Sequence, residues 1–209
     1  METADVDVDG FWQIVERARA TAGPAADRAQ RDGQPSPVTE ALVAELTRLP
    51  LREIVEFDFV FDEVRAEADS WDVCAACWII EYGFLSDDGF SDFCAGLAGM
   101  GRSTFEAAIA DPDSLAGHPA VQEISTSPDH SLWIGDEELL YAANRAYERL
   151  TGDSEAFWEA TEALERSVAP ATGSAEPERG RWDLVDEGEW QRRLPKLGAM
   201  FLAQRMPVT

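Results

Sequence analysis

Large apolar residues recur every three or four positions through most of this chain, and this spacing restricts the fold to packed helices. Between Leu51 and Ala68 they are dense enough to cover more than one helix face, which predicts a central helix buried on two sides. A second run starts at Trp71 and stops at Gly83, a residue that favours the left-handed turn ending many helices. No stretch alternates as a half-buried strand would. The sequence predicts an all-α, irregular single-domain helical bundle with a C-terminal helical or extended tail.

An acidic corner, residues Ser86 to Asp88, separates the Trp71 helix from the next one. A serine can cap a helix, and aspartates in the first turn complement the positive end of the helix dipole. Capping alone therefore explains these residues, but the carboxylates could also gather for a cation or for acid–base chemistry. The candidate binding residues at this corner are Trp71, Asp72, Glu81, Asp87, Asp88 and Phe90.

Other helices are predicted from capping residues and from glycine or proline stops. Ser103 and Glu106 have the spacing of a capping box, in which each side chain bonds a free backbone N–H of the first turn. Residues 117–134 are rich in glycine, proline, serine and threonine, which predicts a long surface loop. We expect the remaining helices at about 9–22, 37–48, 103–110 and 136–151, and another that contains Phe157, Trp158, Thr161, Leu164 and Val168.

The chain divides into a helical domain, residues 8–152, and a C-terminal extension, residues 153–209, made of a helix and a linker. Residues 169–177 have the composition of a linker. Beyond it, Trp182, Trp190 and Phe201 belong to a set of large apolar residues that predicts docking of the tail onto the body.

The charge balance excludes some partners and favours another. The chain has 41 acidic and 17 basic residues, a formal net charge of −24, so it lacks the basic footprint that nucleic acids require. Anionic membranes are disfavoured for the same reason. The negative surface serves solubility, or it steers a basic protein partner towards the chain. The sequence does not indicate an oligomeric state.

The cellular compartment is predicted from what the sequence lacks. The first nine residues carry no basic flank and no apolar run, so they do not resemble a secretory signal. No apolar run approaches the roughly 18 residues that cross a bilayer. Three cysteines in apolar stretches do not form a disulfide framework. These observations favour a reducing cytoplasm.

Several short motifs form a recognisable pattern over about residues 8–152. They are Phe11-Trp12, Phe61-Asp-Glu63, Trp71-Asp72, Ser86-Asp-Asp-Gly-Phe90, Phe93, Gly101-Arg102, Asp111-Pro-Asp-Ser-Leu115 and Glu138-Leu-Leu-Tyr141. Together these motifs resemble the bacterial domain-of-unknown-function family 4240. The late segment Leu194-Pro-Lys-Leu197 is similar to a further element often found near the end of such chains. The resemblance implies no established reaction, cofactor or catalytic set.

Cys74-Ala-Ala-Cys77 has the spacing of a redox pair, but its setting differs from that of redox sites. A reactive thiolate needs an exposed helix start, whereas these cysteines lie on the apolar face of a helix. Structural zinc needs four ligands, and a single pair supplies two. We interpret both as small core residues, and no metal or cofactor is expected.

No catalytic motif stands out. His118 and His130 are the only histidines, and the sequence contains neither a GxSxG elbow nor an HExxH helix. The glycines at 96, 99 and 101 do not form a phosphate-binding loop, because no strand precedes them and no lysine follows.

Two classes of function remain. The first is a non-catalytic helical module that binds a basic protein, in one form an immunity-like protein that blocks a basic nuclease. The second is an enzyme or small-ligand binder with a pocket near the acidic corner. Trp71, Trp78, Phe90 and Phe93 would be the apolar wall of that pocket.

Overall fold

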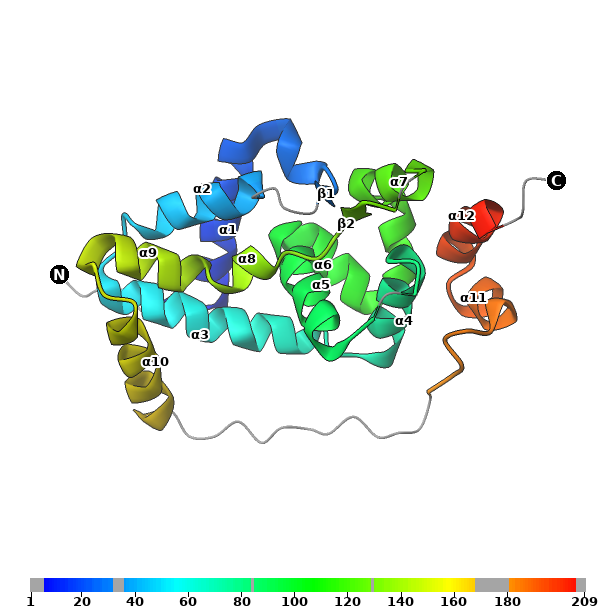
Figure 1. Cartoon of the computed structure of the whole chain (residues 1–209). Coiled ribbons are helices and arrows are strands. Elements are labelled where there is room, and N and C mark those ends of the chain that lie inside the picture. Colours follow the sequence, from blue (N-terminus) through cyan, green and yellow to red (C-terminus); the bar gives the residue numbers. More distant parts are fainter. Residues whose placement is uncertain (1–5, 32–35, 84, 129, 168–180, 206–209) are drawn as a thin grey trace.

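The computed structural model describes residues 6–31, 36–83, 85–128, 130–167 and 181–205. Apart from a two-stranded sheet, the described chain is helical, so the all-α prediction is confirmed (Figure 1). The elements in chain order are α1 (Val8–Ala22), η1 (Gly23–Asp27), β1 (Gln30–Arg31), α2 (Pro37–Leu46), α3 (Leu51–Glu67), α4 (Trp71–Ile80), α5 (Asp87–Gly99), α6 (Arg102–Ala110), η2 (Pro112–Gly117), α7 (Pro119–Thr126), β2 (Leu132–Trp133), α8 (Glu137–Leu140), α9 (Ala142–Thr151), α10 (Glu155–Ser167), α11 (Glu187–Arg193) and α12 (Pro195–Arg205).

One end of the molecule is a stack of α2, α9 and α3, with α1 crossing behind it (Figure 1). Aromatic rings fill the space between α1 and α3. The Phe11 ring stacks on Phe57 and Phe61, with centroids 4.8 and 5.8 Å apart. Aromatic pairs at such distances add to the hydrophobic gain of burial. Helix α3 also packs on α9 and α10. Its predicted burial on two sides agrees with these contacts, but it lies in this end stack rather than at the centre of the molecule.

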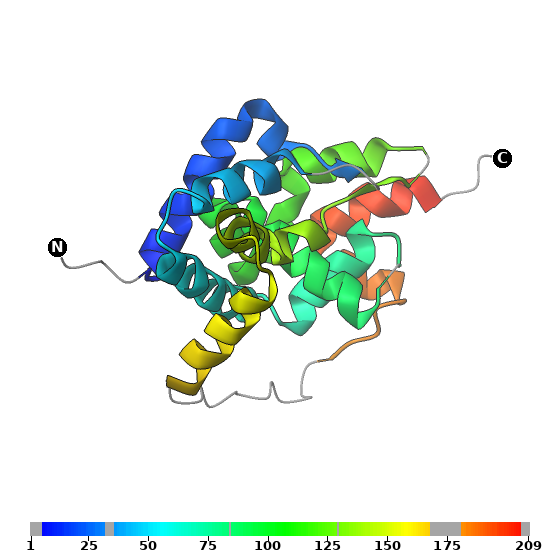
Figure 2. The ribbon, with the colours of Figure 1, turned by 60° about the vertical axis from the view of Figure 1, so that its left-hand side comes forward.

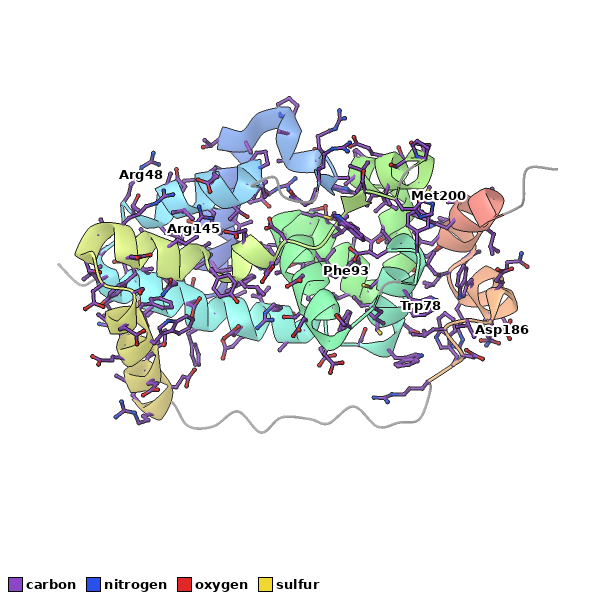
Figure 3. All side chains as sticks on the ribbon, viewed as in Figure 1. Arg48, Trp78, Phe93, Arg145, Asp186 and Met200 are labelled. Carbon is purple, nitrogen blue, oxygen red and sulfur yellow. The ribbon has the colours of Figure 1, made fainter. Side chains whose placement is uncertain are left out.

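Helix α5 passes through the middle of the molecule, and Phe93 on it is fully buried (Figure 3). The segment before α8 crosses α5 at Gly96. A Cβ atom on Gly96 would lie 2.0 Å from the carbonyl oxygen of Ile134, so only glycine fits there. The Asp136 N–H donates to the Asp92 carbonyl at 3.0 Å and fixes the crossing.

Helices α11 and α12 lie beside α4, at the opposite end from α10, in both ribbon views (Figures 1 and 2). Trp190, Leu197 and Phe201 are almost fully buried there. The described tail therefore shares the hydrophobic core of the body. Residues 168–180, which include the whole predicted linker and Val168, lie outside the described residues.

The predicted loop at residues 117–134 is wrong in its middle. It contains helix α7, and its end forms β2, which pairs antiparallel with β1. Pro119 occupies the first turn of α7, where its missing N–H has no helical partner to lose, so this proline starts a helix rather than marking a loop. Val121 and Ile124 are buried one turn apart.

The predicted capping box at Ser103 and Glu106 is also wrong. Helix α6 begins one residue earlier, after Gly101, which has a φ of 90° and no side chain to cap with. Glu106 instead accepts a bond from Arg102 Nε at 2.6 Å. The Glu106 carboxylate therefore binds the Arg102 side chain instead of a free backbone N–H at the helix start.

Two further details differ from the sequence interpretation. Tyr82 shares the left-handed stop of α4 with Gly83, with φ of 55° and 82°. The predicted last strong helix breaks at Tyr141 into α8 and α9, and Leu150, expected in its buried stripe, is 48% exposed. None of the helices in the described ranges could cross a membrane.

Candidate functional site

The candidate binding residues lie in three places rather than at one corner. Trp71 and Asp72 start α4 and contact the C-terminal segment, which we define as residues 181–205. Asp72 Oδ1 accepts from Trp182 Nε1 at 3.1 Å, and Trp71 Nε1 donates to the Trp182 carbonyl at 3.2 Å. Asp72 therefore has a structural partner 110 residues away in the sequence.

Glu81 is buried, not surface-exposed at the corner. Its Oε1 atom accepts the backbone N–H groups of Ile134 and Gly135, each at 3.2 Å. Burial raises its pKa to about 7, while these two bonds lower the pKa and Asp92 raises it. Glu81 thus anchors the segment between β2 and α8.

The capping prediction for the acidic corner is confirmed. Ser86 Oγ accepts the Gly89 N–H at 3.0 Å, and Asp87 and Asp88 lie exposed in the first turn of α5. Of the six candidate residues, only Asp87 and Phe90 line a common surface depression.

This depression, the α3–α5 groove, has a volume of about 420 Å³. It lies between α3 and α5, not between α4 and α5, and the predicted wall residue Phe93 is buried beneath the surface. Three carboxylates, one guanidinium and one aromatic ring line it. The lining residues are Asp62, Arg65, Ala66, Asp69, Asp87, Phe90, Ser91 and Cys94.

Arg65 joins the two walls of the groove. Its Nη2 donates to Asp62 Oδ1 at 2.7 Å, and its Nη1 donates to Ser91 Oγ at 2.5 Å. Its Nε is buried and has no hydrogen-bond partner among the described residues. Because the groove holds three carboxylates and one arginine, its lining charge is −2.

Two carboxyl groups outside the groove lining have raised pKa values. Burial, Asp62 and Glu165 together raise the pKa of Asp58 to about 7. The pKa of Asp92 is also raised, first by burial and then by Glu137, Asp88 and Asp136. Arg65 lowers both pKa values. Arg65 therefore interacts with one carboxylate cluster that includes Asp58 and with another that includes Asp92.

The cysteines are free and poorly suited to thiolate chemistry. Cys77 and Cys94 are buried, and Cys74 is half-buried. Burial raises the pKa of Cys94 to about 12, and it raises the pKa of the other two thiols as well. The interpretation of Cys77 as a core residue is confirmed.

The two histidines have local structural contacts. His118 caps α7, because its Nδ1 accepts the Ala120 N–H at 3.2 Å, and burial lowers its pKa. His130 is exposed, and its ring centroid lies 3.7 Å from that of Tyr82. Within the described ranges, no three histidine, cysteine or acidic residues are placed to hold a metal ion.

The sequence analysis did not include Asp62, Arg65 or Asp69 among the candidate binding residues. A usable signal was present, since Asp62, Arg65 and Asp69 are three and four residues apart and share one helix face. That they face the first turn of α5 depends on tertiary packing.

The fold and the groove define an acidic all-α domain with a charged surface groove. The chain belongs to the family described as "Protein of unknown function (DUF4240)", whose model matches residues 6–149. The motif-based resemblance is thereby confirmed. No curated protein and no solved structure matches the chain.

Proposed function

We propose that the protein is a non-catalytic binding module whose α3–α5 groove receives a basic side chain of a partner protein. The lining charge of the groove supports this proposal, because Asp62, Asp69 and Asp87 outnumber Arg65. Phe90 adds an aromatic face, which attracts an arginine or lysine cation that approaches it.

The surroundings of the groove also favour a cation. Asp58 and Asp92 have raised pKa values partly because neighbouring carboxylates repel their charged forms. A bound cation would offset this repulsion and release protons from the carboxylates. The net charge of −24 adds long-range attraction, which speeds encounter with a basic protein.

A specific form of the proposal is neutralisation of a basic partner, as immunity proteins do with nucleases. The negative charge around α3 and α5 is complementary to the basic surface with which a nuclease binds nucleic acid. Binding of this kind is sensitive to salt.

The proposal is tested by calorimetric titration of the full chain with an arginine-rich peptide at low and high salt. The double variant Asp62→Asn/Asp87→Asn should weaken binding at least tenfold. A matched control, Glu148→Gln/Glu155→Gln, removes two exposed charges from α9 and α10 and should change affinity less than threefold. Equal losses of peptide affinity in the two variants would show that binding is nonspecific charge attraction and would contradict a role for the groove.

The second candidate function is binding or conversion of a small ligand in the same groove. Its volume of about 420 Å³ lies within the range of small-molecule sites, and its lining combines charged groups with the aromatic ring of Phe90. Thermal shifts of the full chain with metals, nucleotides and amino acids test this function. A shift that Asp87→Ala abolishes while the fold persists would favour it over protein binding.

A further inference from the structure

Asp113 is a buried carboxylate whose side-chain partners, among the described residues, come from the C-terminal segment. It lies in η2 and is 4% exposed. Its Oδ1 accepts the backbone N–H groups of Lys196 and Leu197 at 3.0 and 2.9 Å, and its Oδ2 accepts that of Lys196 at 3.1 Å. The Lys196 ammonium lies 3.9 Å from Oδ2. Without these groups a buried charge would lack compensation, which is costly.

The contact at Asp113 is recognition of a helix N-terminus. Lys196 and Leu197 belong to the first turn of α12, where backbone N–H groups have no partner inside the helix and the dipole is positive. The body therefore supplies, from η2, the cap that the start of α12 lacks in its own sequence. Pro195 at the first position has no N–H to satisfy.

A second attachment point lies at the other end of the segment. The Trp182 indole is bonded to Asp72, and its backbone carbonyl is bonded to the Trp71 indole. The Arg181 guanidinium lies 5.0 Å from the Trp71 ring centroid, a cation–π contact. Polar contacts thus hold the segment to α4 at its start and to η2 at the start of α12.

Apolar side chains along the segment add to these polar contacts. Trp190, Leu194, Leu197 and Phe201 are at most 3% exposed. The Phe201 ring meets Tyr82 edge-on with centroids 5.5 Å apart. Helix α12 packs on α4, η2 and α7, and Figure 1 shows α11 and α12 outside α4 at the edge of the body. The segment is therefore held by one buried apolar face together with its polar contacts.

The family match ends at residue 149, so it includes Trp71, Asp72 and Asp113 but not the segment that they bind. Residues 181–205 contain five basic and four acidic residues, a net charge of +1 in a chain of net charge −24. Two carboxylates of the matched domain therefore contact a segment that is much less acidic than the rest of the chain.

We propose that the face formed by α4, η2 and α7 is a binding site for the N-terminal turn of a helix that buries one apolar face, and that residues 181–205 occupy it as an intramolecular ligand. Asp113 recognises the start of the helix, and Asp72 with Trp71 recognises the preceding tryptophan. A partner helix with the same features competes with the segment for this face. The face shares no lining residue with the α3–α5 groove, so the two proposals stand separately.

The test uses the full chain with a protease site placed within residues 168–180. After cleavage, the segment should stay bound during size-exclusion chromatography, and a labelled synthetic peptide of residues 181–205 should exchange into the site, as fluorescence anisotropy reports. Asp113→Ala should weaken peptide binding at least tenfold. The control Glu63→Ala, which removes an exposed charge from α3, should leave it within twofold.

Two outcomes would overturn the proposal. Loss of the body's near-ultraviolet circular dichroism after cleavage, even with excess peptide, would make the segment an inseparable part of the core. Equal peptide affinity in the Asp113→Ala and Glu63→Ala chains would show that Asp113 does not recognise the start of the helix. Exchange with the expected loss at Asp113 supports the proposal, because an integral core helix would not exchange.

Discussion

Arg65 of α3 donates to the Ser91 hydroxyl of α5 at 2.5 Å, so one hydrogen bond connects the two walls of the acidic groove. The same guanidinium lowers the pKa values of Asp58 and Asp92, whose carboxylate neighbours raise them. Arg65 is therefore both a connection between helices and the internal counterion of the groove.

Removal of this counterion should raise both pKa values. In the Arg65→Met variant the positive charge that stabilises the carboxylates is lost while much of the side-chain volume remains. Carboxyl-carbon NMR titration of the wild type and the variant measures the two pKa values. An unchanged titration of Asp58 and Asp92 would mean that Arg65 does not interact with them electrostatically.

Stability should fall as the pH rises towards neutrality, because Glu81 has a pKa of about 7 in the folded chain against 4.5 as its ordinary value. The folded state holds this proton more tightly than the unfolded state. The stabilisation is fully present below pH 4.5 and is lost as the pH passes 7, with a span of roughly 3 kcal/mol.

Urea unfolding at pH 5 and pH 8 checks this pH dependence. The Glu81→Gln variant keeps an oxygen acceptor for Ile134 and Gly135 but cannot titrate, so its free energy of unfolding should change less between the two pH values. Equal changes in the variant and the wild type would show that Glu81 does not titrate in this range.

Gly96→Ala should destabilise the fold by about 1 to 3 kcal/mol or more, since the added methyl group collides with backbone rather than with a flexible side chain. The control is Gly117→Ala, whose Cβ would meet no atom within 4 Å and should shift stability by less than about 1 kcal/mol. Chemical denaturation of both variants gives the comparison. Similar stabilities would contradict the close approach of α5 to Ile134.

Phe93→Ala should lower the free energy of unfolding by about 3 to 5 kcal/mol, because the ring is fully buried and its loss leaves a cavity. Leu150→Ala provides the surface control, since Leu150 is 48% exposed. A loss below about 1 kcal/mol at Phe93 would place that ring outside the core.

Local signals in the sequence predicted the helices well. Ser86 caps α5 as expected, because a cap depends on residues within one turn of itself. The start of α7 was missed because Pro119 marks a helix start as readily as a helix end. Both outcomes were decided by neighbours in sequence.

The candidate site was less predictable, because its geometry depends on contacts between distant residues. Asp72 is near the acidic corner in sequence but bonds to Trp182, and Glu81 lies beneath Ile134 and Gly135. Neither partner can be inferred from helical spacing. Only Asp87 and Phe90 remained together in the groove.

The most direct test of the central claim is amide hydrogen exchange of the full chain with and without a saturating arginine-rich peptide. Binding in the α3–α5 groove predicts slower exchange within residues 62–69 and 87–94, reversed by high salt and absent in the Asp62→Asn/Asp87→Asn variant. Protection confined to other helices, or protection that persists unchanged in this variant, would contradict the proposed site.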